Sequence, residues 1–310
     1  MARNSDAPRF SVILPCLDDG RLLERTIESL RAQTFKDFEV LLVDALSHDG
    51  TAGIMDGAVA ADRRFRAFRG PSRNCAAARN MARGLARGDF LAFCEPGDLF
   101  EPHKLAILDQ ALCDSTVDGA YGEVLPLGAR RGRAFYVLPD TDLSIGQLLG
   151  ANPLVTLSNL CVRRGAFLAT GSFDTGLAHG DELEWLIRLV GHGFRITPVE
   201  APLTRFGRAG KLAPVDLDSL RGGRAASLRT AARYGVHPTP ADEAIQLRSL
   251  AWSALRQGSH GFRALGIALD GLRISPRGFF AQPATAIMTL AGGLVSSVLP
   301  PGLRRVLFTI

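Results

Sequence analysis

The chain has 310 residues, about two domains' worth by length, of which 46% are hydrophobic and 22% are charged. This composition excludes wholesale disorder, and no fixed-period repeat is found. The formal net charge is +5, from 36 basic and 31 acidic residues, and all but three of the basic residues are arginine. We attribute the richness in Arg, Ala and Gly to a GC-rich coding genome and predict no nucleic-acid partner.

The cysteines and the N-terminus bear on the compartment. Five cysteines stand singly, with no C-x-x-C pair, which argues against a structural zinc site and against a disulfide framework. The first ten residues are polar and lack the apolar core of a signal peptide. We therefore expect a cytoplasmic chain.

The first 110 residues alternate between strand and helix patterns. Apolar runs predict strands at 10–14, 38–43, 65–68 and 90–93, and helical spacing predicts helices at 22–30, 50–62 and 75–87. Strands separated by helices are typical of an α/β fold with a mostly parallel, doubly wound sheet.

The pattern changes twice in the remaining chain. Residues 119–206 are mixed, with strands predicted at 120–127, 134–138, 155–162 and 194–199 and a helix at 181–190. Helices with Arg-rich faces follow at 217–234, 242–257 and 262–272. We expect one domain over residues 1–211 and a helical C-terminal region over residues 212–310.

No charged residue occurs between Gly278 and Leu303. The apolar part is interrupted by Pro283 and by adjacent glycines, and it is too short for a confident membrane span of about 20 residues. A helix packed on the protein, or a partner contact, is the preferred interpretation. The alternative is a helix at the inner face of the membrane, aided by Arg304 and Arg305.

Acidic residues follow three of the predicted strands, namely Asp18 and Asp19, then Asp44, then Glu95 and Asp98. Sheets of this type bind ligands beyond the carboxyl ends of their strands. Because no G-x-G-x-x-G loop is present, a dinucleotide site is a poor match. A nucleotide held by carboxylates, with Mg²⁺ or Mn²⁺ on its phosphates, fits better.

The run from Ser11 to Thr51 closely resembles the opening of glycosyltransferase family 2, which has the GT-A fold. The similarity continues through Ala78-Arg79-Asn80, through FLAFCEPGDLFEPHKL and through GSFDTGLAHGDELEWLIRL, and it covers about two-thirds of the chain. It implies a Rossmann-like, mostly parallel sheet and transfer of a sugar, with inversion, from a nucleotide-sugar donor of UDP type. No Q-x-x-R-W motif of polymerising relatives is present, so we expect a single sugar to be transferred to a glycan or lipid-linked acceptor.

The resemblance also implies residue roles at the nucleotide. Asp44 matches an aspartate that contacts the base, and the loop of Pro15, Leu17 and Asp18 would lie along the nucleoside. Arg79 matches an arginine that helps to hold the nucleotide. The structural alternatives are a turn-capping role for Asp44 and a solvated helix face for Arg79.

The metal motif departs from the family pattern. The family has Asp-x-Asp where this chain reads Glu95-Pro-Gly97, followed by Asp98, so that the expected carboxylate aligns with Gly97. Glu95 and Asp98 are the candidate ligands of a divalent cation, Mn²⁺ or Mg²⁺. The alternative is a plain turn, since Pro-Gly forms one by itself.

The candidate catalytic residues are Asp181 and Glu182. The resemblance places the general base at Glu182, and inverting transfer needs a carboxylate that takes the proton of the acceptor hydroxyl. The structural alternative is a helix N-terminus, whose dipole favours acidic residues. Together with Gly97, the longer side chain of Glu182 leaves a second hypothesis open, a non-catalytic relative that acts as a nucleotide-binding or scaffolding protein.

Overall fold

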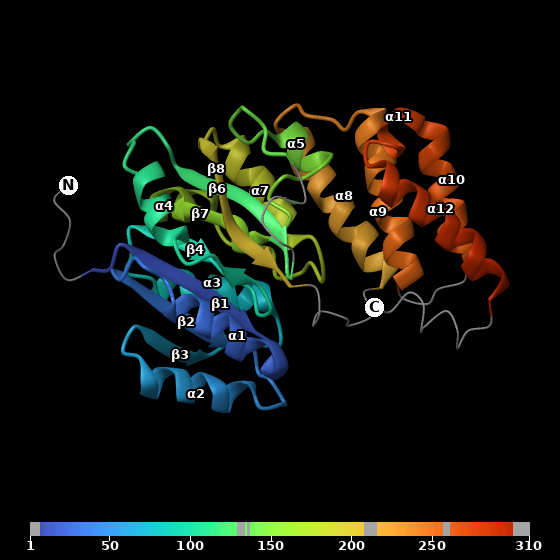
Figure 1. The fold of residues 1–310 in the computed structure, drawn as a ribbon. Helices are drawn as coiled ribbons and strands as arrows, with labels where there is room; N and C mark the ends of the chain where they lie inside the picture. Colours follow the sequence, from blue (N-terminus) through green and yellow to red (C-terminus); the bar gives the residue numbers. More distant parts are fainter. Residues whose placement is uncertain (1–6, 129–133, 135–136, 208–215, 257–260, 300–310) are drawn as a thin grey trace. The chain divides into compact units, whose positions relative to one another are not determined.

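The computed structural model describes residues 7–128, 134, 137–207, 216–256 and 261–299 (Figure 1). The chain divides into two compact units. The first comprises Met1–Leu143, Pro153–Gly176 and Arg188–Gly210, and the second comprises Ser144–Asn152, Leu177–Ile187 and Lys211–Ile310. The second unit thus also takes two segments that precede the boundary predicted near residue 212.

The first unit is built on a sheet that has eight strands among the described residues, in the order β3-β2-β1-β4-β7-β6-β8-β5. The strands are β1 (Phe10–Cys16), β2 (Phe38–Asp44), β3 (Phe65–Arg69), β4 (Phe90–Phe93), β5 (Leu99–Phe100), β6 (Gly119–Pro126), β7 (Leu160–Arg163) and β8 (Ile196–Phe206). Strands β3, β2, β1 and β4 are parallel to one another, as are β6 and β8. The pairs β4–β7, β6–β7 and β5–β8 are antiparallel, so the sheet is mixed.

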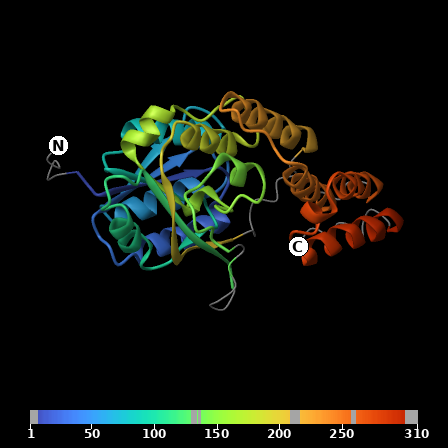
Figure 2. The same ribbon diagram turned by 90° about the horizontal axis from the view of Figure 1, so that it is seen from above.

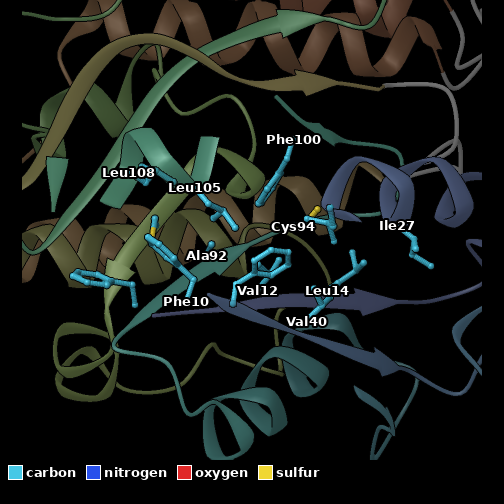
Figure 3. Packing of buried hydrophobic residues seen from close by; sticks show 14 of the residues in the cluster. Phe10, Val12, Leu14, Ile27, Val40, Ala92, Cys94, Phe100, Leu105 and Leu108 are labelled. Carbon is cyan, nitrogen blue, oxygen red and sulfur yellow. The ribbon is translucent and has the colours of Figure 1, made fainter. Parts of the chain in front are cut away.

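Strands β1 and β2 are buried along their whole length, which explains their continuous apolar sequences. Their register pairs Phe10 with Phe38 and Cys16 with Asp44, so both strands end at one edge of the sheet. Val12 and Leu14 of β1 pack in one hydrophobic cluster with Ile27 (Figure 3). The predicted parallel half of the sheet is confirmed.

The helices of the first unit are α1 (Gly20–Arg31), α2 (Thr51–Ala61), α3 (Cys75–Leu85), α4 (Lys104–Ala111) and α6 (Arg164–Thr170). Helix α1 contributes Leu23, Ile27 and Leu30 to the cluster, at the spacing that predicted an amphipathic helix. Helix α4 contributes Leu105 and Leu108, which are labelled in Figure 3. Helix α3 packs on β1 and β2.

Two predicted strands are not found as expected. Residues 134, 137 and 138 lie in no strand, and residues 135–136 lie outside the described residues. The segment predicted as a strand at 155–162 begins instead with a 3₁₀ turn, η1 (Leu157–Asn159), and only then enters β7. The Asn159 side chain donates to Gly122 O at 2.7 Å and accepts from Gly122 N at 3.3 Å. This side chain thereby makes the contacts to β6 that a strand backbone would make.

The second unit is helical among its described residues. It contains α5 (Ile145–Leu149), the first turns of α7 (Asp181–Gly191), α8 (Leu217–Arg233), α9 (Pro240–Arg256), α10 (Gly261–Ile274), α11 (Pro276–Phe279) and α12 (Pro283–Val298). Helices α9, α10 and α12 pack against one another (Figure 2). Their cluster is built mainly from small residues, Ala244, Ala251, Ala268 and Ala286, around Phe279. Within the described part of the chain, no helix has the length and apolar character needed to cross a membrane.

Candidate functional site

The loops after β1 and β2 form one hydrogen-bonded surface. Ala45 N donates to Cys16 O at 2.7 Å, and Asp18 N donates to Ser47 Oγ at 3.0 Å. In return, His48 N donates to Asp18 Oδ1 at 2.6 Å. The two strands end at the same edge because they are parallel and in register. The loops that carry Asp18 and Asp44 are therefore neighbours, as the sequence predicts.

Asp18 lies on the exposed side of this surface with a φ of 55°, a left-handed conformation that aspartate tolerates better than most residues. Its Oδ2 accepts from Arg73 Nη2, whose other nitrogen, Nη1, donates to Leu46 O at 2.5 Å. The His48 amide and the Arg73 guanidinium hold the pKa of Asp18 below its ordinary value, so the side chain is a carboxylate at neutral pH. Sequence reasoning missed Arg73.

Asp44 is buried, and its Oδ1 accepts from Ser47 N at 2.9 Å. This is the turn-capping contact of the structural alternative, so a role for Asp44 at a nucleotide base stays a prediction. Pro15 is buried within β1 and pairs with Val43. Leu17 is half-buried, and its backbone N–H donates to Oδ2 of the buried Asp19 at 2.8 Å.

Arg79 and Glu95 form a buried ion pair. Arg79 Nη2 lies 2.7 Å from Glu95 Oε1, and the Arg79 side chain is only 3% exposed. Its guanidinium also lies 5.5 Å from the centre of the Phe173 ring, within the range of a cation–π contact. The alternative of a solvated helix face is therefore wrong for Arg79, because its partner is a carboxylate at the end of β4 rather than water.

Asp98 is held by three hydrogen bonds. Thr156 Oγ1 and Ser158 Oγ donate to its Oδ2 at 2.7 and 2.6 Å, and Gly207 N donates to its Oδ1 at 3.1 Å. Burial, together with the charge of nearby Glu95, raises the pKa of Asp98 to about 6 although these hydrogen bonds oppose the shift. Asp98 thus ties three separate segments together at the end of β4.

The chain between Glu95 and Asp98 is a tight turn. Asp98 N donates to Glu95 O at 3.0 Å, Pro96 occupies the second position, and Gly97 occupies the third with a φ of +93°. This is the arrangement of a type II turn, which requires a positive φ at its third residue. A Cβ at position 97 would meet Gly207 O at 3.2 Å and Leu22 Cδ1 at 3.3 Å. The Pro-Gly turn of the structural alternative is confirmed.

These contacts do not fit a divalent cation bracketed by Glu95 and Asp98. Hydroxyl and amide donors point at both oxygens of Asp98, and the Arg79 guanidinium faces Glu95, whereas a cation is bound by oxygens that present lone pairs. Across the described residues, no cluster of three or more His, Cys, Asp or Glu side chains is arranged to hold a metal ion. The two carboxylates are accounted for as part of a structural junction.

Lys104 extends this junction into the core. Its Nζ, fully buried, donates to Ser158 O at 2.5 Å and to Thr204 Oγ1 at 2.9 Å. Burial lowers the pKa of Lys104 to about 7. Sequence reasoning missed this lysine and its partner Ser158, which lies 54 residues farther along the chain. The only sequence signal that pointed to Lys104 was its place in the segment FLAFCEPGDLFEPHKL, which resembles glycosyltransferase family 2.

Asp181 and Glu182 lie in the second unit, in the first turn of α7, and both are half-buried. Glu184, in the same turn, is buried and accepts from Thr230 Oγ1 of α8 at 2.9 Å. Gly180 precedes the helix with a φ of +84°, and a Cβ there would lie 3.0 Å from Gly223 Cα. The structure confirms that Asp181 and Glu182 lie at a helix N-terminus, as the structural alternative expected. The general-base role of Glu182 stays a prediction.

Comparison with known proteins shows which family part of this chain resembles. Residues 11–141 match the model of glycosyl transferase family 2. The glycosyltransferase GlyG of Streptococcus pneumoniae is 24% identical over 140 residues, which are 45% of this chain and 46% of that protein. The GalNAc(5)-diNAcBac-PP-undecaprenol beta-1,3-glucosyltransferase of Campylobacter jejuni is 32% identical over 33% of this chain and 34% of that protein. The match thus spans less than half the length of either relative.

Solved structures share the fold. The crystal structure of S. aureus TarS 1–349 in complex with UDP matches with a TM-score of 0.61 at 14% identity, over 93% of this chain and 89% of that one. The mannosyltransferase PcManGT of Pyrobaculum calidifontis, in complex with GDP-Man and Mn²⁺, matches with a TM-score of 0.62 at 18% identity, over 98% and 88%. Residues 11–141 of this chain are thus similar to glycosyl transferase family 2, and the mixed sheet has the GT-A fold expected from the sequence.

Proposed function

We propose that this chain transfers a single sugar, with inversion, from a nucleotide-sugar donor of UDP type to a hydroxyl group of a glycan or lipid-linked acceptor. The observation that carries the proposal is the joined surface of the loops after β1 and β2, with Asp18 and Asp44, at the sheet edge where α/β folds bind nucleotides. The complexes of TarS with UDP and of PcManGT with GDP-Man, which have the same fold, support it.

In this proposal the nucleoside lies along the loop of Pro15, Leu17 and Asp18, and Asp44 faces the base. An ionised carboxylate only accepts hydrogen bonds, so it suits the N–H group of a uracil ring and the hydroxyls of a ribose. Asp18 is charged at neutral pH, and the lowering of its pKa from an already acidic value favours the charged form further. Leu17 offers an apolar contact to the nucleoside and no aromatic ring for stacking.

The reaction is a direct displacement at the anomeric carbon. The acceptor oxygen forms the new bond as the bond to the diphosphate breaks, and the electron pair leaves with the nucleoside diphosphate. Glu182 takes the proton of the acceptor hydroxyl, and Asp181 lies beside it in the same helical turn. Arg73 pairs with Asp18 and Arg79 with Glu95, and we assign both arginines to the negative charge of the diphosphate.

The proposal is tested by incubating the purified chain with a panel of nucleotide sugars and measuring nucleotide release. The substitution E182Q removes the base and is expected to lower kcat by about a hundredfold to ten-thousandfold, with unchanged nucleotide affinity. E243Q is the matched control, because Glu243 is also an acidic residue in the first turn of a helix, α9. If no donor binds and none is turned over, the proposal is wrong.

The nucleotide site has a separate test. D44N is expected to weaken nucleotide binding about tenfold by calorimetry, since the amide replaces a charged acceptor with a neutral group. D89N is the control, because Asp89 directly precedes β4 and so lies at the opposite end of that strand from Glu95. If D44N and D89N bind the nucleotide with equal affinity, Asp44 is not part of the nucleotide site.

The second candidate function is a nucleotide-binding protein without transfer. Glu95 and Asp98 favour it, because protein groups engage both carboxylates in a structural junction. Nucleotide binding without turnover for any donor would favour this candidate over the transferase. Turnover that E182Q leaves unaltered would instead remove Glu182 from the transferase mechanism.

A further inference from the structure

Helix α12 buries its small side chains and exposes its large apolar ones, which is the reverse of the usual arrangement. Its buried residues are small, namely Ala286, Thr289, Gly292, Gly293 and Ser296. Its large apolar residues are exposed, with exposed fractions of 60% for Ile287, 54% for Met288, 59% for Leu294, 45% for Val295 and 82% for Val298. These five residues recur at helical spacing and form one stripe, which we call the apolar face of α12.

The packing of α12 on its neighbours explains why this face stays outside. A Cβ at Gly293 would lie 3.2 Å from both Cα and Cβ of Leu265 in α10, so the two helices approach too closely there for a larger side chain. Helix α12 lies alongside α10 and α9 in Figures 1 and 2, and both pack on its small residues. Rotating the helix to bury its large residues would separate these contacts.

An exposed apolar face of this kind is uncommon on a monomeric protein unless the face binds something. The face carries no charge, because no charged residue occurs from Gly278 to Leu303. Arg273 and Arg277, both exposed, precede the helix in the chain. An occupant that combines apolar and negatively charged groups would match both features.

The net positive charge of the chain comes from residues 211–310, the region that contains α12. Residues 211–310 contain twelve Lys and Arg against five Asp and Glu, a formal charge of +7, whereas the full chain carries +5. The preceding 210 residues therefore carry a formal charge of −2. Two copies of so basic a region would repel each other across a shared face, whereas a negatively charged surface would attract it.

We infer that the apolar face of α12 docks on the surface of an anionic lipid bilayer, with arginines of the helical region at the headgroups. The helix has 16 residues and is about 24 Å long, shorter than the roughly 30 Å hydrocarbon core of a bilayer, so it lies on the membrane rather than across it. The inference does not depend on the proposed transferase activity.

Vesicle flotation of the full chain tests this docking. One set of vesicles is phosphatidylcholine alone and the other contains phosphatidylglycerol as well, and neither contains a nucleotide or a glycan acceptor. The chain is expected to float with the anionic vesicles and to be released in large part by molar salt, which screens headgroup attraction. Failure to float, or equal binding to both vesicle types, would overturn the inference.

Two double substitutions distinguish the contribution of the apolar face to vesicle binding from the contribution of the arginines. I287S/L294S is expected to reduce binding to anionic vesicles about tenfold. The matched control is V59S/V137S, which removes two exposed valines from the first unit and should bind as the unaltered chain does. R273Q/R277Q, which leaves α12 itself intact, should weaken binding to anionic vesicles only. A dimer in light scattering that I287S/L294S dissociates would assign the face to a second copy and overturn the inference.

Discussion

Ser158 and Asp98 are joined by a hydrogen bond of 2.6 Å, from Ser158 Oγ to Asp98 Oδ2, across 60 residues of sequence. The same hydroxyl oxygen accepts from Glu95 N at 2.9 Å. A single side chain thus holds both ends of the turn that follows β4. The carbonyl of Ser158 in turn accepts from the buried Lys104.

Removing this hydroxyl is expected to destabilise the first unit. In S158A the buried Asp98 loses one donor and the Glu95 amide loses its acceptor, so we expect the free energy of unfolding to fall by about 2–3 kcal/mol in urea titrations. S249A is the control, because Ser249 is exposed and donates only to Ile245 O of its own helix. Equal loss in the two variants would show that Ser158 does not hold the turn.

Asp98 is expected to make stability depend on pH. Its folded-state pKa of about 6 lies above the ordinary 3.8, so its contribution is fully present below pH 3.8 and is lost as the pH rises through 6. The loss is on the order of 3 kcal/mol. Unfolding titrations between pH 4 and 7 of the unaltered chain and of D98N should differ in slope over this window.

The control for that comparison is D270N, because Asp270 is largely exposed. This variant should retain the pH dependence of the unaltered chain. If D98N retains it as well, another group is responsible for the slope.

The substitution G97A tests whether the turn after β4 has room for a side chain at position 97. G97A places a Cβ at positive φ and within 3.2 Å of Gly207 O, and we expect a loss of about 2 kcal/mol in the free energy of unfolding. G128A is the matched control, since Gly128 has a φ of +83° with no atom within 4 Å of its Cβ position. G128A should lose only the part of the free energy of unfolding that comes from placing a side chain at positive φ, about 1 kcal/mol. Indistinguishable losses would show that the Gly207 segment yields to the methyl group.

Nucleotide affinity is expected to be nearly independent of divalent cations. Because Asp98 and Glu95 are engaged by protein donors, UDP titrations with Mn²⁺ and with EDTA should give dissociation constants within about threefold of each other. A much tighter complex in Mn²⁺ that E95Q abolishes would show that the ion pair with Arg79 opens to admit a cation.

Much of the first unit could be predicted because its signals are local. The apolar runs of β1 and β2 and the helical spacing of α1 lie within short stretches of sequence, and parallel pairing then brings Asp18 and Asp44 to neighbouring loops. Segment 155–162 was misjudged because its apolar pattern suits a strand, whereas the Asn159 side chain bonds to Gly122 in β6. No local pattern indicates a partner 37 residues away.

The sequence by itself indicated the resemblance to glycosyl transferase family 2 and the parallel core, since these signals lie in short stretches of the chain. Only the tertiary structure decided that Arg79 is buried against Glu95 and that Asp98 faces hydroxyl and amide donors. The physical reason is that a carboxylate's role depends on which groups surround it in space. For Asp98 those groups come from segments 58 to 109 residues away.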